Sequence, residues 1–207
     1  MISLDHIIWA VPDREEGMAH FERLTGIVPV IGGSHPGRGT RNALVSLGTK
    51  CYLELLAPDP EQPPADNFGA ALRDLSAPKI FTFAVASSGL EALGEKARKA
   101  DLPFRGPESW SRSLSPENTL HWEAAFIEGT QFAHHVPFFI DWLESRHPAI
   151  SSPTGMSLLK FDVMHPDAEG LSRLYETLDI GIPVRRSDRP TLRAVLQGPR
   201  GELVLNS

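Results

Sequence analysis

The chain has 207 residues, of which 41% are hydrophobic and 22% charged, values typical of a folded globular protein rather than a disordered one. Its formal net charge of -6, without a continuous basic run, argues against a nucleic-acid partner. No stretch approaches the roughly 20 apolar residues of a membrane-spanning helix, and the first residues lack the basic start and apolar core of a signal peptide. We therefore expect a cytoplasmic protein without a membrane partner.

The first part of the chain predicts a strand, a helix and three further strands. Residues 4–11 form an apolar run of strand length, and Pro12-Asp13 ends it with a helix-start signal. Apolar residues between 16 and 24 then recur at helical spacing. A short strand over 27–30, a glycine-rich loop over 32–40 and two strands over 42–47 and 51–56 follow. The predicted order is β-α-β-β-β.

The middle of the chain predicts a more divergent copy of the same unit. Residues 80–85 form its first strand and residues 90–97 open its helix. The remaining strands are expected at 102–104, 120–125 and 136–142. This assignment depends on the order of the elements more than on residue identity.

The C-terminal part repeats the first unit at a constant offset. A shift of 154 residues superimposes Pro12-Asp13 on Pro166-Asp167, and Pro29-Val30 on Pro183-Val184, without a gap. Two strands around 194–196 and 203–205 complete this copy, and proline-rich linkers at 57–65 and 147–155 separate the three units. The chain is therefore read as an array of repeated modules.

A lone β-α-β-β-β module cannot bury both faces of its sheet, because its helix covers only one, so modules must pair. We predict an α+β fold in which βαβββ modules pair into a half-open mixed β-barrel with the helices outside. The expected domain is residues 1–146, with modules at 1–58 and 78–146, and a third module at 155–207 packs on it. Alternate strand residues would line a concave pocket for a small-molecule substrate.

Several short motifs in this order resemble the glyoxalase-like domains of the vicinal oxygen chelate superfamily. They are Leu4-Asp5-His6-Ile7, the segments 32–36 and 39–42, Tyr52-Leu53-Glu54-Leu55, and 137–142 followed by His147-Pro148. The resemblance implies paired modules around a concave site. It also implies a function among lyases, isomerases, extradiol dioxygenases, metal-dependent resistance enzymes and metal-free binding proteins. Relatives that pair modules between chains make a homodimer an expected assembly.

His6 and Glu54 stand where metal-binding members of this superfamily have ligands, on the first and last strands of a module. Alternation lets both side chains point into one concavity. An imidazole and a carboxylate suit zinc, iron, manganese or nickel. Without a metal, Glu54 would act as a general base on an acidic carbon, with His6 orienting it. The alternative readings are a buried structural histidine and a structural ion pair.

The later modules do not supply the missing ligands. The positions equivalent to His6 and Glu54 carry other residues: Ile80, Lys160, Ile140 and Val204. The candidates for a third ligand are His121, His134 and His135 on the strands of the middle copy, and the alternative reading of each is a surface histidine or one that supports the ligands without binding the metal.

Five further residues are candidates for substrate binding. His35, Thr40 and Asn42 belong to the glycine-rich segment, which is either a ligand-contacting loop or a tight connection between strands. Trp122 and Phe138 are either core residues or the wall for an apolar substrate.

The leading hypothesis is a lyase, isomerase or dioxygenase that acts on vicinal-oxygen substrates with a divalent metal at His6 and Glu54. The alternative is a metal-free protein that binds a small molecule or sequesters an antibiotic in the same cavity. The absent ligands in the later modules favour this alternative.

Overall fold

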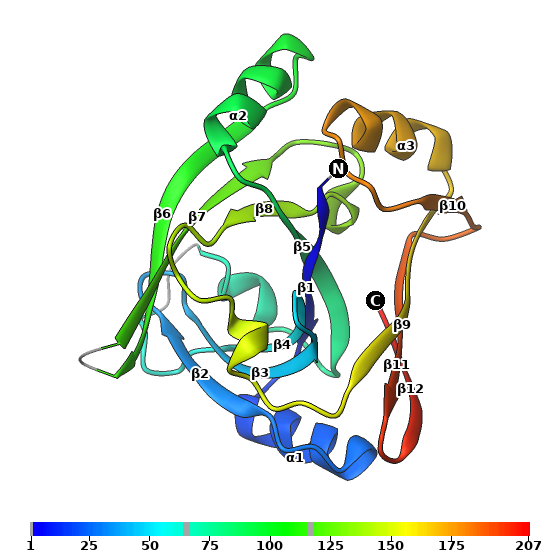
Figure 1. Cartoon of the computed structure of the whole chain (residues 1–207). Helices are drawn as coiled ribbons and strands as arrows, with labels where there is room; N and C mark the ends of the chain where they lie inside the picture. Colours follow the sequence, from blue (N-terminus) through cyan, green and yellow to red (C-terminus); the bar gives the residue numbers. More distant parts are fainter. Residues whose placement is uncertain (1, 64–66, 116–117) are drawn as a thin grey trace.

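The structure is a computed structural model that describes residues 2–63, 67–115 and 118–207 (Figure 1). The first module contains β1 (Ser3–Ala10), α1 (Arg14–Thr25), β2 (Val30–His35), β3 (Thr40–Gly48) and β4 (Cys51–Pro58). Next come η1 (Ala70–Leu72), β5 (Lys79–Ala86), α2 (Leu90–Lys99), β6 (Phe104–Ser115), β7 (Asn118–Ile127), η2 (Ala133–His135), β8 (Phe138–Asp141) and η3 (Pro148–Ile150). The third module contains β9 (Ser157–His165), α3 (Ala168–Thr177), β10 (Val184–Arg186), β11 (Thr191–Gly198) and β12 (Gly201–Asn206).

The first two modules share one eight-stranded mixed sheet, in the order β2-β3-β4-β1-β5-β8-β7-β6. They join where β1 runs antiparallel to β5, while β1 also pairs in parallel with β4. The edge strands β2 and β6 contact each other, so the sheet curls into a half-barrel (Figure 1). The predicted α+β fold with a half-open barrel is thereby confirmed.

The 154-residue offset between the first and third modules holds in the structure. Asp13 accepts a hydrogen bond from the backbone N–H of Glu16 and caps α1, and Asp167 accepts the equivalent bond from Gly170 at α3. The strands that follow the two helices both begin at the offset valines, Val30 and Val184. The repeat therefore reproduces local structure as well as sequence.

Three predicted assignments differ from the structure. Residues 27–29 are not in a strand, because Pro29 has no N–H to donate and the N–H of Ile27 is taken by the Thr25 hydroxyl at 3.1 Å. The glycine-rich segment is mostly a hairpin, with His35 paired opposite Thr40. In the middle copy, the strand expected at 102–104 is replaced by β6, which begins only at Phe104 and runs on to Ser115.

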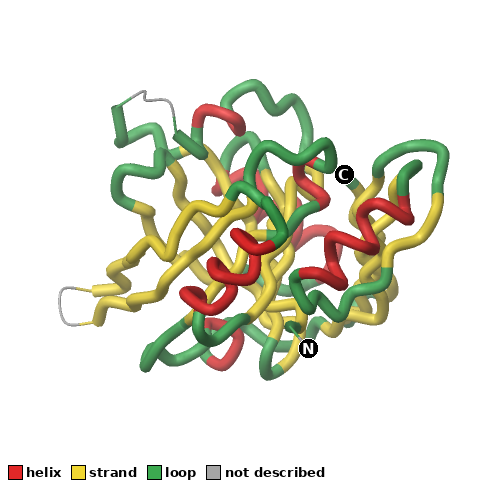
Figure 2. The backbone as a smooth tube through the Cα atoms, turned by 90° about the horizontal axis from the view of Figure 1, so that it is seen from above, coloured by secondary structure: helices red, strands yellow, loops and turns green. Residues whose placement is uncertain are grey.

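The third module forms its own sheet, in the order β10-β9-β11-β12, and covers part of the convex face of the barrel. Its Leu192 is fully buried in the same apolar cluster as Ile7 and Phe83 of the large sheet. The rings of Phe83 and Phe161 meet edge to face with centroids 4.9 Å apart. Figures 1 and 2 show this module beside the curled sheet, so it leaves the concave face uncovered.

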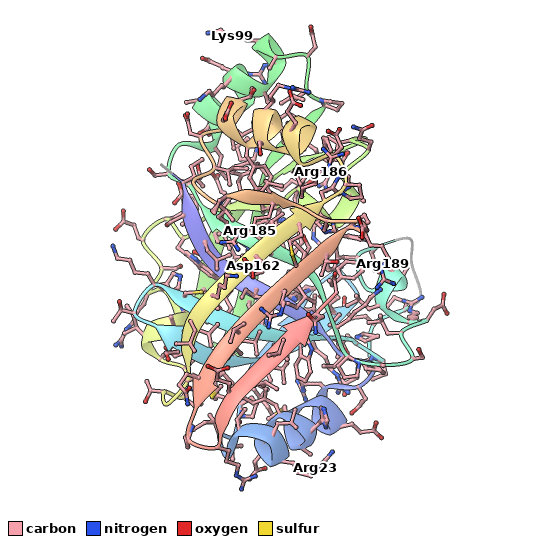
Figure 3. All side chains as sticks on the ribbon, turned by 90° about the vertical axis from the view of Figure 1, so that its right-hand side faces the viewer. Arg23, Lys99, Asp162, Arg185, Arg186 and Arg189 are labelled. Atoms are coloured by element: carbon pink, nitrogen blue, oxygen red, sulfur yellow. The ribbon has the colours of Figure 1, made fainter. Side chains whose placement is uncertain are left out.

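The outer face of the third module carries charged side chains that neutralise one another. Asp162 is buried and has three cations around it: Lys160 at 2.9 Å, Arg185 at 3.6 Å and Arg193 at 3.8 Å. Figure 3 labels Asp162 and Arg185 on this face. These arginines therefore form ion pairs on a sheet face rather than a phosphate-binding track. In the described part of the chain, no helix combines the length and the hydropathy needed to span a membrane.

Candidate functional site

A cavity lies in the concave face of the eight-stranded sheet and has an empty volume of about 590 Å³, its open mouth included. His6 and Glu54 line it together with all five predicted substrate-binding residues, which are His35, Thr40, Asn42, Trp122 and Phe138. The other lining residues are Ile8, Tyr52, Leu56, Phe68, Trp110, Arg112, Ala124, Phe126, Ile140 and Trp142.

Strand alternation positions these side chains. On β4, Tyr52 and Glu54 point into the cavity, and their partners on β1 are His6 and Ile8, which point the same way. The rings of His6 and Tyr52 stack with centroids 4.5 Å apart. The structure thus brings His6 and Glu54 into the same hollow.

Asp5 reaches His6 because β1 contains an irregularity. The register of β1 against β5 shifts between Leu4 and His6, which leaves Asp5 without a partner in the ladder. Asp5 is 1% exposed, and its Oδ1 lies 2.7 Å from Nδ1 of His6. Simple alternation places consecutive residues on opposite faces, so the sequence patterns did not reveal this contact.

Asp5 collects three donors. Besides His6, the indole N–H of Trp142 and Nε2 of His147 each lie 3.1 Å from its Oδ2. Burial alone would raise the pKa of Asp5, but the hydrogen bonds and charges of His147 and His6 outweigh it and lower the pKa to about 2. Asp5 is therefore a carboxylate that accepts only. Nδ1 of His6 carries the hydrogen, and in the neutral ring Nε2 presents its lone pair.

Glu54 faces Nε2 of His6 inside the cavity. Its Oε2 lies 3.6 Å from Nε2 of His6, and its Oε1 accepts a 2.6 Å hydrogen bond from the side-chain amide of Asn42. Among the described residues, Oε2 has no hydrogen-bond partner of its own. One oxygen of the carboxylate is thus fixed and the other is available to a ligand.

His35 supports Asn42 as a neutral ring. Its Nδ1 lies 2.9 Å from the Thr40 hydroxyl, and its Nε2 lies 3.3 Å from the Asn42 amide nitrogen. Desolvation by burial lowers the pKa of His35 to about 4 against the opposing pull of Glu54. His35 and Asn42 therefore act together to hold Oε1 of Glu54.

This neutral histidine makes stability depend on pH. Between pH 6.5 and pH 4 the unfolded chain binds a proton at His35 that the folded protein does not, so stability falls as the pH decreases through this window. Between pH 7 and pH 4.5 we expect the free energy of unfolding of the wild type to fall by about 2 kcal/mol more than that of His35→Gln. Urea unfolding at the two pH values measures this difference. His121→Gln, which changes an exposed histidine, should match the wild type, and equal pH slopes for all three proteins would contradict the account.

The cavity offers few ligands for the divalent metal that the family resemblance implies. His6 and Glu54 supply two ligand atoms, whereas protein metal sites commonly use three or four. In the described ranges there is no group of three or more His, Cys, Asp or Glu side chains able to hold a metal ion. A cation, Arg112, lines the same cavity. The described residues of this chain therefore do not fit a metal site by themselves. The metal predicted at His6 and Glu54 would need ligands from outside these residues, and it stays a prediction.

The three histidines considered as a third ligand do not line the cavity. His134 and His135 are not on a strand but in η2, and they line a separate hollow near the third module with Lys79 and His165. His121 is on β7 next to the inward-facing Trp122, so alternation turns it outward, and it is exposed. None of these three candidates therefore supplies a third ligand in this arrangement.

A family model described as "Glyoxalase-like domain" matches residues 4–178. This covers most of the chain, including every strand that forms the cavity. The chain belongs to the glyoxalase-like domain family. It is thereby a member of the vicinal oxygen chelate superfamily, as the sequence motifs predicted. A comparison with curated proteins gave no significant match.

Solved structures share the glyoxalase-like fold. A hypothetical protein from Staphylococcus aureus aligns over 100% of this chain and 85% of its own, with 16% identity and a TM-score of 0.71. A methylmalonyl-CoA epimerase variant from Streptomyces coelicolor, in complex with 2-nitronate-propionyl-CoA, aligns over 68% of this chain and 97% of its own, with 16% identity and a TM-score of 0.51. These likenesses concern the fold.

Proposed function

We propose that this glyoxalase-like chain is a cytoplasmic small-molecule enzyme of the isomerase or lyase type that removes a proton from a carbon next to a carbonyl group. The observation that carries the proposal is the free Oε2 of Glu54, which faces an apolar cavity 3.6 Å from Nε2 of an Asp5-oriented His6. Glu54 is the general base. Asn42 holds its Oε1, and Nε2 of His6 offers a second position for the proton.

The proton transfer needs no oxidant or reductant. The carboxylate of Glu54 takes the proton, the C–H electron pair forms a carbon–carbon double bond, and the carbonyl π pair moves onto oxygen to give an enolate. Return of the proton to the same carbon gives exchange or inversion, and its return elsewhere gives an isomer. Hydrogen-bond donors fixed in a low-dielectric cavity stabilise the charge that develops on oxygen.

The likeness to methylmalonyl-CoA epimerases supports this class of chemistry. Their name describes inversion at a carbon, and one such structure holds a CoA derivative within the same fold. For this chain we propose a carbon acid with vicinal oxygens, in line with the family resemblance. We also propose that residues 1–146 carry the site and that the module at 155–207 is architectural.

Deuterium exchange tests the proposal with a panel of candidate carbon acids. Several 2-oxo acids, with phenylpyruvate among them, are incubated with the protein in D₂O, and loss of the C3–H signal is followed by proton NMR against enzyme-free samples. We expect catalysed exchange for at least one member, unchanged in the presence of EDTA. Binding without exchange would contradict the proposal and favour the binding-protein alternative. Exchange that needs added zinc, iron, manganese or nickel would favour the metal-dependent hypothesis.

A further inference from the structure

Arg112 on β6 is a buried cation in the wall of the cavity. It is 4% exposed, and among the described lining residues it is the only Arg or Lys. Removing a guanidinium from water is costly unless an anion or several acceptors compensate it. Its surroundings therefore need an explanation.

The described residues give Arg112 no anionic partner. Its Nη1 donates to the neutral Oδ1 of Asn42 at 3.1 Å, and its buried Nε has no hydrogen-bond acceptor. Glu108, on the same strand, is held by Arg38 at 2.9 Å and by Arg105. The amide of Asn42 stands between Arg112 and Glu54, accepting from the first and donating to the second. The cation and the base are thus linked without forming an ion pair.

The backbone makes room for this arrangement at Gly32. A Cβ added at Gly32 would lie 2.1 Å from Oδ1 of Asn42 and 2.3 Å from Nη1 of Arg112. Gly32 lies on the edge strand β2 where its register against β3 shifts, so the two edges of the curled sheet meet at the guanidinium. Only a residue without a side chain permits this close approach. Arg112 is therefore held in place, with donors left over.

From these contacts we infer that Arg112 binds the carboxylate of a small apolar acid inside the cavity, which names the substrate class of the proposed function and rests on it. A guanidinium presents a planar fork that matches a carboxylate. One cation suits a single negative charge, whereas a phosphate dianion calls for further cations or a helix N-terminus, which this wall does not offer in its described residues.

The remaining walls of the cavity determine which tail the acid can carry beyond its carboxylate. Aromatic rings of four strands line the same cavity as Arg112: Tyr52, Trp110, Trp122, Phe126 and Phe138. They offer apolar surface and ring edges to an aromatic or branched aliphatic tail. The ligand class is thus a monocarboxylate whose tail is apolar and whose acidic carbon faces Glu54.

Equilibrium binding of an unreactive acid tests this inference. The probe is 3-phenylpropanoate, which has no keto group to acidify its C–H bonds. Its neutral isostere is 3-phenylpropanamide. Quenching of the cavity tryptophans Trp110, Trp122 and Trp142 reports binding. We expect the wild type to bind the acid at least 10-fold more tightly than the amide. Arg112→Gln should reduce this preference to less than threefold, mainly by lowering the affinity for the acid.

Arg189→Gln is the matched control, because it removes one positive charge from an exposed position of the third module (Figure 3). It should keep the full preference for the acid. Equal affinities of the wild type for acid and amide would overturn the inference, and so would a preference that survives in Arg112→Gln. If circular dichroism shows Arg112→Gln to be unfolded, Arg112→Lys is measured instead. Because lysine lacks the planar fork, this variant should bind the acid at least threefold more weakly and bind the amide with unchanged affinity.

The result can be separated from that of the exchange experiment. Selective binding of 3-phenylpropanoate through Arg112, without exchange of any 2-oxo acid, leaves the anion site standing and removes the proton-transfer chemistry. If the exchange rate of a 2-oxo acid does not change in Arg112→Gln, the proton-transfer chemistry stands and the anion site is overturned.

Discussion

Replacing Glu54 with glutamine is expected to slow deuterium exchange of the active 2-oxo acid by about 1,000-fold, the usual contribution of a general base. Glutamine preserves the shape of the side chain, and its amide oxygen can still accept the hydrogen bond from Asn42. It cannot take a proton from carbon. The fold and the binding of 3-phenylpropanoate should therefore change little while the exchange rate collapses.

Proton NMR rates at saturating ligand measure this effect, with circular dichroism and fluorescence titration as checks on folding and binding. The matched control is Glu95→Gln, which makes the same chemical change at an exposed position of α2. It should retain the wild-type rate. A Glu54→Gln protein that binds the acid and exchanges it within tenfold of the wild-type rate would show that another group removes the proton.

Asp5→Asn is expected to lower the exchange rate by about 100-fold through His6, without any contact with the ligand. Three donors point at Asp5, namely Nδ1 of His6, the Trp142 indole and Nε2 of His147. An asparagine offers one acceptor oxygen and one NH₂ group, so its NH₂ must oppose one of these donors. The acceptor oxygen is best placed where Trp142 and His147 both donate, so the NH₂ group faces Nδ1 of His6. His6 then changes tautomer, and its Nε2 turns from an acceptor into a donor.

This positioning role has a signature that a purely structural role lacks. Nitrogen-15 NMR of the imidazole rings should find the hydrogen of His6 on Nδ1 in the wild type and on Nε2 in Asp5→Asn. The kcat should fall with little change in KM, because Asp5 is not in the ligand's path. Asp74→Asn, at an exposed position, serves as the control. An unchanged tautomer together with an unchanged kcat would remove Asp5 from the account.

The sequence predicted the modules because local signals and the repeat agree. The N-cap aspartates Asp13 and Asp167 and the fixed offset between the outer modules identified two helices and the strands around them. The boundary at residues 27–30 was predictable only in part: Pro29 is visible in the sequence, whereas the bond between the Thr25 hydroxyl and the N–H of Ile27 is not. The closure of the sheet depends on contacts between β2 and β6, which are distant in sequence.

The candidate site was predictable to the extent that it follows strand alternation. His6, Asn42 and Glu54 line one cavity for that reason. Asp5 was missed because the irregularity in β1 breaks the alternation. Arg112 was missed because it lies well beyond the short strand expected at 102–104, and because its partner Asn42 is 70 positions away in the chain.

A crystal structure of Glu54→Gln with phenylpyruvate bound tests the central claim most directly, since this variant holds the ligand without turning it over. The account predicts that the C3 carbon lies within about 3.5 Å of the side-chain terminus at position 54, the separation of reacting atoms in a near-attack geometry. Nε2 of His6 should lie on the same side of the ligand. A ligand whose C3 carbon points away from both positions, towards the aromatic wall, would contradict it.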